Sequence, residues 1–369
     1  MPSMQGRVIN IVDNVKATNA GVWNAAISTA QDLSDRSWFS ELWFPDSKAP
    51  TVDVPVKLYP LRSRRLSEVD HIIKERDLKK NRDLIVTHGC WSYCTRWGWA
   101  FQRLGFKWIY TPHGMLEPWA LTQKFLKKKL YLNLFEMPMA RHSSAIRAVS
   151  TSESHNLGRI FKNTKLQVIP NGVFIKPLPL SKTSKVIQYL FLGRLHQKKG
   201  VVELVIGWKK SILNNNPQYR LVIAGPDDGE LLQLSNHISA SENIEYVGPV
   251  FGGKKDKLFA ESTFFVLPSH SEGLPTSILE AMSYGLFLLI SSGCNLPEVF
   301  SLNLGMRVEP VVDVIAEKLT ESSHLSIETR NETTLRAREF VSMNFSIRSV
   351  AMQQLEFYQT LFSAPLVKE

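Results

Sequence analysis

The sequence predicts an α/β protein of two domains, each built on a parallel sheet that helices cover on both faces. Short apolar segments typical of strands alternate with longer segments of helical periodicity, an order characteristic of parallel sheets. This alternation restarts after residues 172–185, which are rich in Pro, Ser and Lys and which we interpret as a linker. The 369 residues are also enough for two ordinary domain cores.

The first domain is predicted to span residues 1–175. Seven strands are expected, at residues 7–13, 38–44, 54–59, 84–87, 108–111, 146–150 and 166–169. Helices are expected between them, at residues 22–33, 67–80, 91–104, 124–141 and 153–161.

The second domain is predicted to span residues 176–345. Its strands are expected at residues 186–192, 219–224, 244–247, 264–267 and 287–291. Ligands of open parallel sheets bind beyond the carboxyl ends of the strands. Arg194, Gly225, Gly248 and Glu272 each follow a strand, so we expect them to meet at one rim. By the same rule residues 14–21, 88–89 and 113–114 form the rim of the first domain.

Two carboxylates eight positions apart mark the most informative segment, Glu272-Gly-Leu-Pro-Thr-Ser-Ile-Leu-Glu280. A buried strand precedes it, and Pro275 is expected in the first turn of the following helix, where its missing N–H costs nothing. A helix start offers free amides and a positive dipole to an anion. A carboxylate beside such an anion site suits a ligand that also carries hydroxyl groups, and a nucleotide-sugar is such a ligand.

A second motif, Gly193-Arg194-Leu-His-Gln-Lys-Lys199-Gly, follows another predicted strand. Gly193 lets the backbone approach a ligand closely. Arg194 and Lys199 bring two cations whose donor geometries suit phosphate oxygens. Lys198 is expected to point to solvent.

Together, G-R-L-x-x-x-K-G and E-G-L-P-x-x-x-x-E-A-M resemble the motifs of the retaining nucleotide-sugar glycosyltransferases of family 4. The resemblance implies the GT-B fold, in which two Rossmann-like domains face a cleft. It also implies that the last amphipathic helix, within residues 346–369, crosses back to the first domain.

The resemblance assigns roles to the motif residues. Glu272 contacts hydroxyls of the transferred sugar, Glu280 accepts from the donor ribose, and Arg194 and Lys199 bind the diphosphate. Backbone near Val250 contacts the base. Donor-site positions are also implied for Gly193, Gly273, Leu274, Pro275 and Gly21.

Thr111-Pro112-His113-Gly114-Met115-Leu116-Glu117-Pro118-Trp119 resembles a segment of the polysaccharide-assembly members of the family. By this resemblance His113 approaches the reacting carbon of the donor sugar. His88 and Trp119 are weaker candidates for the acceptor side. The sequence departs from the family at its first loop, where Gly21 stands alone instead of in a glycine pair, and at Pro170-Asn-Gly-Val-Phe174, which lacks an acid.

Charge is distributed unevenly along the chain. Residues 1–180 hold 26 Lys+Arg and 14 Asp+Glu, a net +12, whereas the remainder has 18 and 20, a net −2, and the two sum to the total of +10. The basic half fits an anionic membrane surface or a merely solvated face. The segment Lys124-Phe-Leu-Lys-Lys-Lys-Leu-Tyr131 mixes cations with apolar residues as interfacial helices do. No motif supports nucleic acid as a partner.

The sequence shows neither a signal peptide nor an apolar run long enough for a membrane span, so we expect a cytoplasmic protein. Peripheral contact with the inner face of the plasma membrane stays open. Cys90, Cys94 and Cys294 fit reduced structural thiols; a metal pair at Cys90 and Cys94 with His88 lacks a second pair. No D-x-D triplet occurs, so no metal and no cofactor are expected.

These observations predict a retaining glycosyltransferase that moves a hexosyl unit from a UDP- or GDP-sugar to a glycan or polyprenyl-diphosphate-linked acceptor in O-antigen, capsule or exopolysaccharide assembly. Two carboxylates also suit a glycosidase, but a glycosidase has no phosphate to hold. A GT-B epimerase or phosphorylase and a catalytically silent nucleotide-sugar-binding subunit stay open as alternatives. The donor base, the sugar and the linkage are not written in any motif.

Overall fold

The computed structural model describes residues 6–46, 48–122, 125–162, 164–178, 186–239 and 241–363. It divides into two compact units. The first comprises Met1–Gly172 with Ile347–Glu369, and the second comprises Val173–Ser346. Of the expected linker, residues 179–185 lie outside the described residues, and residues 174–178 form no helix or strand.

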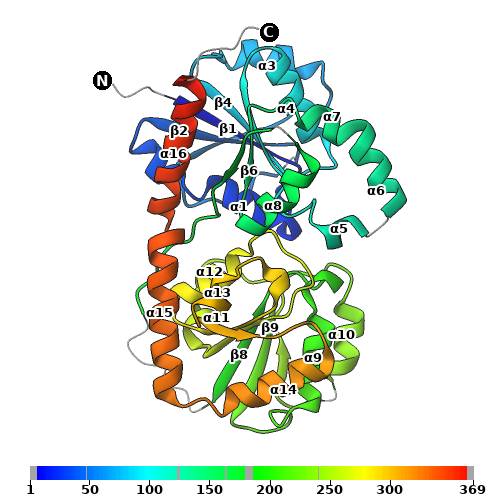
Figure 1. The fold of residues 1–369 in the computed structure, drawn as a ribbon, viewed down its shortest axis with the longest axis vertical. Coiled ribbons are helices and arrows are strands. Elements are labelled where there is room, and N and C mark those ends of the chain that lie inside the picture. Colours follow the sequence, from blue (N-terminus) through cyan, green and yellow to red (C-terminus); the bar gives the residue numbers. More distant parts are fainter. Residues whose placement is uncertain are drawn as a thin grey trace. The chain divides into compact units, whose positions relative to one another are not determined.

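The first unit is built on a seven-stranded parallel sheet of order β3-β2-β1-β4-β5-β6-β7 (Figure 1). All seven predicted strands are present. Their bounds are β1 (Gly6–Val12), β2 (Trp38–Phe44), β3 (Val56–Pro60), β4 (Asp83–His88), β5 (Lys107–Thr111), β6 (Ala145–Ala148) and β7 (Leu166–Val168). The strands β1, β4 and β5 end in register, with Val12 beside His88 and His88 beside Thr111. The loops that follow these strands therefore start from one edge of the sheet.

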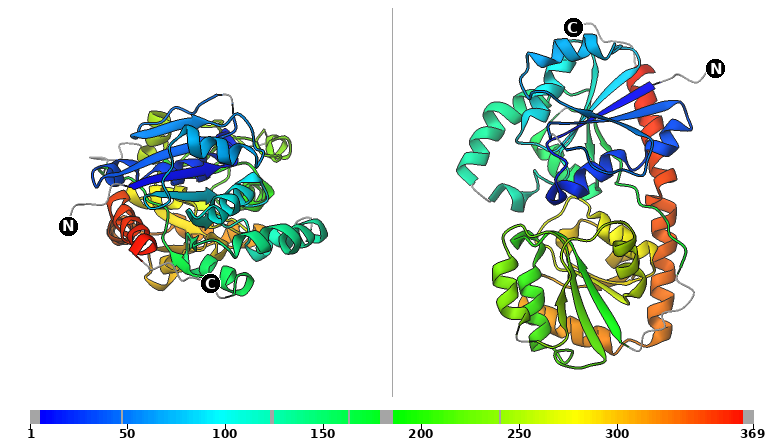
Figure 2. Two further views of the ribbon diagram at one scale, coloured as in Figure 1. Left: turned by 90° about the horizontal axis from the view of Figure 1, so that it is seen from above. Right: turned by 180° about the vertical axis from the view of Figure 1, so that it is seen from behind.

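Helices flank this sheet in both orientations of the ribbon (Figures 1 and 2). They are α1 (Ala20–Ile27), α2 (Ala30–Ser34), α3 (Glu68–Glu75), α4 (Tyr93–Arg103), α5 (Pro118–Thr122), α6 (Phe125–Tyr131), α7 (Met137–Ala140), α8 (Thr151–Ile160) and α16 (Ile347–Ser363).

The C-terminal helix α16 packs on the first unit. Its apolar side, with Tyr358 and Leu361, joins Trp38 in one core cluster, and the Trp38 and Tyr358 rings lie 5.6 Å apart. Thr29 Oγ1 donates to Gln354 Oε1 at 2.6 Å. The prediction of one continuous helix over residues 22–33 is wrong, because Thr29 adopts a non-helical conformation between α1 and α2, where it meets α16.

The prediction of one helix over residues 124–141 is also wrong. A π-helical turn, Leu132–Glu136, separates α6 from α7, and Lys124 lies outside the described residues. At the end of this turn the buried Glu136 accepts from Thr95 Oγ1 at 2.6 Å and from Tyr110 OH at 2.8 Å. The wider turn thus places a carboxylate inside the unit.

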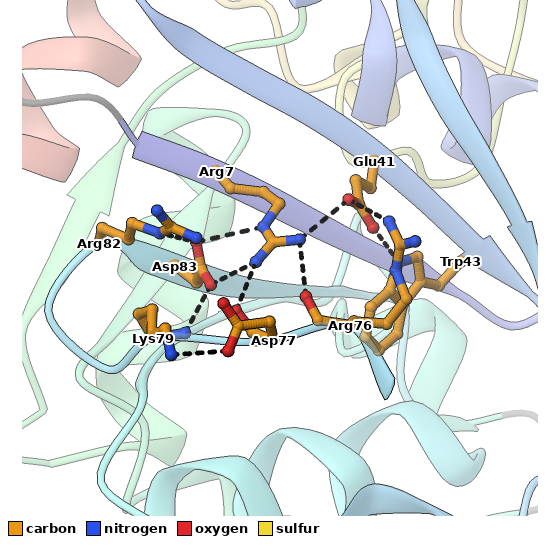
Figure 3. Close-up of polar contacts among 8 residues, drawn as sticks. All are labelled: Arg7, Glu41, Trp43, Arg76, Asp77, Lys79, Arg82 and Asp83. Atoms are coloured by element: carbon orange, nitrogen blue, oxygen red, sulfur yellow. Dashed lines mark hydrogen bonds and ion pairs between the residues drawn. The ribbon is translucent and has the colours of Figure 1, made fainter. Parts of the chain in front are cut away.

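A cluster of ion pairs lies at the opposite edge of this sheet, where β1 begins (Figure 3). Arg7 Nη2 donates to the fully buried Asp83 at 2.7 Å and Arg7 Nη1 to Glu41 at 3.3 Å. The helix expected over residues 67–80 ends early, at Glu75, and the carbonyl oxygens of Arg76 and Asp77 accept from Arg7 instead.

The second unit is built on a parallel sheet, which Figure 2 shows from behind. This sheet has six strands in the order β10-β9-β8-β11-β12-β13. Its bounds are β8 (Ile187–Leu192), β9 (Tyr219–Ala224), β10 (Ile244–Tyr246), β11 (Phe264–Leu267), β12 (Phe287–Ile290) and β13 (Gly305–Arg307). The strand β13 was not predicted, because this three-residue edge strand carries neither an apolar run nor an alternation.

The helices of the second unit are α9 (Val201–Lys210), α10 (Leu231–Ile238), α11 (Gly252–Glu261), α12 (Thr276–Ser283), α13 (Glu298–Ser301), α14 (Val312–Ser323) and α15 (Ile327–Phe345). The core of the sheet is aromatic. Tyr189 of β8 lies beside Phe264 of β11, and their rings stack with centroids 4.4 Å apart. Pro275 lies just before α12 and not inside its first turn, with an extended backbone.

Among the described residues, no helix is long and apolar enough to cross a membrane, and no three His, Cys, Asp or Glu side chains cluster as metal ligands would. Cys90, Cys94 and Cys294 are unpaired by disulfides and buried.

Candidate active site

The candidate residues fall on both units, and most lie in the second unit, in loops after its strands. The backbone there is tightly joined: Gly193 N donates to Ala224 O at 3.0 Å and Gly225 N to Gly248 O at 2.9 Å. A Cβ atom on Gly225 would lie 1.8 Å from Gly193 O, and the φ of Gly225 is +145°. Only glycine allows the loops after β8 and β9 to approach so closely.

Lys199 and Glu272 form a largely buried ion pair. Lys199 Nζ lies 2.6 Å from Glu272 Oε1, and both side chains are about nine-tenths buried. A 3₁₀ turn, Gln197–Lys199, carries the lysine; His196 Nδ1 caps this turn by accepting from Lys198 N at 2.9 Å. Gly200 ends the turn at φ +64°, where a Cβ would lie 2.2 Å from Pro268 O. The turn is therefore seated against the end of β11.

Further contacts fix Glu272. Ser269 Oγ donates to Glu272 Oε1 at 2.8 Å, and Asn295 Nδ2 donates to the Glu272 carbonyl at 2.5 Å. Burial by itself would raise the pKa of Glu272, but the charges of Lys199 and Lys198 and the hydrogen bonds outweigh it, so the pKa is lowered. Glu272 is therefore a carboxylate at neutral pH. Lys198, expected to point to solvent, is half-buried, and its charge acts on this site.

Arg194 lies just after β8 and is paired, a contact that the sequence analysis missed. Arg194 Nη1 donates to Asp228 Oδ2 at 2.6 Å, with side chains that are 41% and 31% exposed. An ion pair this exposed is worth at most about 1 kcal/mol. An anion of higher charge, such as a phosphate, can therefore replace Asp228 at Arg194 with little loss of free energy.

Glu280 lies on α12, two turns beyond Glu272, as expected. Lys255 Nζ of α11 lies 2.6 Å from Glu280 Oε1, a second partner that sequence reasoning did not find. The intervening Gly273, Leu274 and Pro275 are buried, and Val250 is half-buried before α11.

In the first unit, His88 and His113 are in contact. His88 Nδ1 and His113 Nε2 lie 2.9 Å apart, and His88 Nε2 lies 3.0 Å from Asn10 Oδ1. Burial, and then the charge of Arg147, lower the pKa of His113 to about 3. Burial likewise lowers the pKa of His88 well below its usual value, helped by His113 and Arg147. Both rings are therefore neutral at physiological pH.

The loop of His113 is held by Glu153. Gly114 N donates to Glu153 Oε1 at 2.5 Å, and Val149 N donates to Glu153 Oε2 at 2.7 Å. Ser150 Oγ caps α8 by accepting from Glu153 N at 3.1 Å. The Ser-x-x-Glu pattern of a helix start is readable in the sequence, although the link from Glu153 to the histidine loop is not.

Two further candidates lie on helices. Gly21, expected in a loop, lies in the first turn of α1, where a Cβ atom would meet nothing within 4 Å. Trp119 lies on α5 and is half-buried.

Asn10, the partner of His88, was not among the predicted site residues. The sequence does carry a signal for it, because Asn10 is the one amide within the apolar strand segment Val8-Ile-Asn10-Ile-Val12.

Comparison with known families covers both units. Residues 175–340 match the family described as Glycosyl transferases group 1, and residues 25–172 match the Glycosyl transferase 4-like domain. The O-antigen biosynthesis glycosyltransferase WbnH of Escherichia coli is 32% identical over 250 residues, which make up 65% of this chain and 68% of the relative. The chain therefore belongs to the group 1 glycosyltransferases.

Two other relatives are similar over less of their length. The gpi3 subunit of phosphatidylinositol N-acetylglucosaminyltransferase from Schizosaccharomyces pombe is 24% identical over 298 residues, 78% of this chain but 63% of the relative. A UDP-Gal:alpha-D-GlcNAc-diphosphoundecaprenol alpha-1,3-galactosyltransferase of Escherichia coli is 34% identical over 146 residues, 35% of this chain and 37% of the relative.

Solved structures share the fold. Sucrose-phosphate synthase from Thermosynechococcus elongatus superposes with a TM-score of 0.77 at 18% identity, covering 97% of this chain and 99% of that one. Anabaena HepE in complex with UDP and glucose gives a TM-score of 0.74 at 17% identity, covering 96% and 99%. At these identities the likeness establishes the fold, which is GT-B with two parallel-sheet α/β domains.

Proposed function

We propose that the protein is a retaining, metal-independent glycosyltransferase that moves a hexosyl unit from a UDP- or GDP-sugar to a hydroxyl of a glycan or lipid-linked acceptor. The observation that carries the proposal is the ionised, buried Glu272 beside Lys199, with Arg194 at the same rim. Cations for a diphosphate and a carboxylate for sugar hydroxyls are the two requirements of such a donor.

Arg194 and Lys199 would bind the donor diphosphate. When the bond to the sugar breaks, negative charge grows on the β-phosphate, and fixed cations stabilise that charge as a divalent metal does in other enzymes. Arg194 can exchange the exposed Asp228 for phosphate, and the N-terminus of α12 adds its dipole.

Glu272 would bind the sugar as a hydroxyl acceptor. Lys199 and Ser269 both contact Oε1, and within the described part of the chain no group donates to Oε2. This oxygen is the one available to a sugar hydroxyl. Glu280, held by Lys255 through Oε1, would accept from the ribose.

Retention would follow from reaction on one face of the sugar. Glu272 is paired with Lys199 and accepts from the Ser269 hydroxyl, which makes it a poor covalent nucleophile. The leaving phosphate oxygen would take the proton of the acceptor hydroxyl as that hydroxyl bonds to the anomeric carbon.

The relatives support the class of substrate. HepE was solved with UDP and glucose, and the E. coli galactosyltransferase is named for a UDP-sugar and a diphosphoundecaprenol-linked acceptor. With the O-antigen enzyme WbnH, they favour a lipid-linked acceptor in cell-surface polysaccharide assembly. GDP-sugars stay among the candidate donors, because a GDP-mannose:cellobiosyl-diphosphopolyprenol alpha-mannosyltransferase of Xanthomonas oryzae is 27% identical over 152 residues.

A surface on α6 and the π-helical turn, here called the α6 surface, would contact an anionic membrane where such acceptors reside. Its exposed apolar side chains are Phe125, Leu126, Leu130, Leu134 and Phe135, and Lys127, Lys128 and Lys129 lie among them. Apolar side chains beside cations suit the interface of anionic lipids.

Vesicle flotation tests the membrane contact. We expect wild type to float with phosphatidylglycerol vesicles and not with phosphatidylcholine, and Leu126→Glu/Leu130→Glu to stay in solution. Leu335→Glu, a like change at an exposed leucine of α15, is the control. Equal flotation of the Leu126/Leu130 variant and the control would contradict the contact.

Nucleotide release tests the enzyme. Wild type in EDTA should release UDP or GDP from one donor of a panel, with lipid-linked acceptor present, and the product should keep the anomeric configuration of the donor. Glu272→Gln should lose at least about a hundredfold in rate, whereas Glu261→Gln, at an exposed glutamate of α11, should not. Absence of release with every donor would favour the silent binding subunit.

A further inference from the structure

We propose that Asn10 and His88 are positioning residues that fix the tautomer of His113, so that His113 Nδ1 is presented as a hydrogen-bond acceptor for a substrate hydroxyl. The three side chains form one line of hydrogen bonds, from β1 through the end of β4 to the loop after β5. The hydroxyl part of this inference rests on the proposed function, and the tautomer part does not.

The line starts at Asn10, whose amide can face only one way. Asn10 is 3% exposed, and its Nδ2 donates to the carbonyl oxygen of Glu41 on β2 at 3.2 Å. A carbonyl oxygen only accepts, so the Asn10 nitrogen must face Glu41. The Asn10 oxygen is therefore the atom that faces His88.

The orientation of Asn10 decides where His88 carries its proton. Asn10 Oδ1 can only accept, so His88 Nε2, 3.0 Å away, must be the protonated nitrogen. A neutral imidazole carries one N–H, which leaves His88 Nδ1 without a proton. His88 is held neutral by its burial and by the nearby charge of Arg147.

His88 in turn decides the tautomer of His113. His113 Nε2 lies 2.9 Å from the unprotonated His88 Nδ1, so Nε2 must carry the proton of His113. His113 is neutral as well, which leaves a lone pair on its Nδ1. Within the ranges that the structure describes, no group hydrogen-bonds His113 Nδ1, and the residue is half-buried. This nitrogen is then ready to accept from a hydroxyl, and unable to donate.

The backbone holds the His113 ring in place independently of this line. His113 has φ +53° and Gly114 has φ +72°, and Gly114 N is bound by Glu153. A change at Asn10 should therefore alter the proton position on His113 while its loop stays in place. This separation makes the inference testable.

The experiment combines NMR of the full-length protein, labelled with ¹⁵N-histidine, with steady-state kinetics. Long-range ¹H–¹⁵N correlations distinguish a protonated from an unprotonated ring nitrogen, and His113→Gln assigns the resonances. In wild type we expect His113 to be protonated at Nε2 alone. In Asn10→Leu, His88 loses its acceptor, and we expect protonated Nδ1 to become visible at His113.

Thr29→Val is the matched control, because it removes another buried hydrogen bond of the first unit, to Gln354. With the donor found active, kcat of Asn10→Leu should fall about tenfold or more with KM little changed, and Thr29→Val should match wild type.

Protonated Nδ1 on His113 in wild type, or an unchanged tautomer in Asn10→Leu, would overturn the inference. An altered tautomer with unchanged kcat would overturn the part that concerns substrate. Expected tautomers without nucleotide release from any donor would support the positioning role of Asn10 and His88 and count against the proposed function alone.

Discussion

At the scale of single residues, two buried glutamates differ in charge state because their partners differ. Glu272 has Lys199 at 2.6 Å, and its pKa is lowered in spite of burial. Glu153 is bound by two backbone N–H groups, and burial raises its pKa to about 7 despite those bonds and the charge of Arg147. The positive charge of Lys199 thus keeps Glu272 ionised, whereas the neutral N–H donors leave Glu153 with a pKa near neutral pH.

Lys199→Met should destabilise the second unit by about 3 kcal/mol, because it leaves Glu272 buried without its counter-charge. Lys199→Met/Glu272→Gln should recover most of this loss. Hydrogen exchange of β8 and β11 amides measures the stability of this unit. Equal protection in the single and the double variant would show that the pair does not act as a unit.

Glu153 should make the first unit less stable as pH rises. Its folded pKa of about 7 lies above the ordinary 4.5, so between these values the folded state binds more protons than the unfolded state, and stability falls with increasing pH. One pKa unit is worth about 1.4 kcal/mol, so the full effect is about 3 kcal/mol.

Glu153→Gln should lack this pH dependence, whatever its absolute stability. Urea unfolding at pH 5 and pH 8 gives the comparison, and fluorescence reports mainly the first unit, which holds eight of the nine tryptophans. The same loss of stability between pH 5 and pH 8 in wild type and variant would exclude Glu153 as its source.

At the scale of elements, the π-helical turn between α6 and α7 has a clear structural cause. It carries Glu136 to three donors, Thr95 Oγ1, Tyr110 OH and Trp91 N. Apolar periodicity predicts a helix over residues 124–141, but it does not reveal one wider turn, because the residues on either side of that turn remain helical. The same limit hid the break at Thr29, whose partner on α16 lies 325 positions away in the sequence.

Glu136→Leu should lower the unfolding free energy by about 3 kcal/mol, because three buried or half-buried donors lose their acceptor. Glu136→Gln should cost clearly less, since its amide oxygen can still accept from Thr95 and Tyr110. Urea unfolding followed by tryptophan fluorescence compares the two, and similar losses would mean that hydrogen bonding at this turn contributes little.

At the scale of the whole molecule, each sheet has candidate site residues at the carboxyl ends of its strands, and the first unit has an ion-pair cluster at the other edge. Asp83 there accepts from Arg7 at 2.7 Å and from Lys79 N at 2.7 Å (Figure 3). Asp83→Asn should therefore destabilise the first unit by about 3 kcal/mol and leave kcat unchanged below its melting temperature. Thermal unfolding and nucleotide release measure the two effects, and a loss of kcat at full folding would contradict this separation.

Most strand positions and the residues that follow the strands were predictable because they depend on local patterns, namely apolar runs, Gly-rich turns and the two motifs, whereas the order of the strands in each sheet was not predicted. Asp228, Lys255 and Asn10 were not predicted, because each acts through a partner from another segment of its unit. Pair partners of this kind follow from tertiary packing, which a single sequence does not reveal.

The central claim is that the second unit binds a nucleoside diphosphate through fixed cations and without a metal. Titration calorimetry of UDP and GDP in EDTA tests this claim most directly, with wild type, Arg194→Met and the control Arg220→Met. Arg220 is a suitable control because it forms an exposed ion pair with Glu245 at the opposite ends of the strands, where β9 and β10 begin. We predict binding of one nucleotide by wild type and control, and an affinity at least about tenfold weaker in Arg194→Met. Binding that requires a divalent metal, or that is equal in both variants, would contradict the claim.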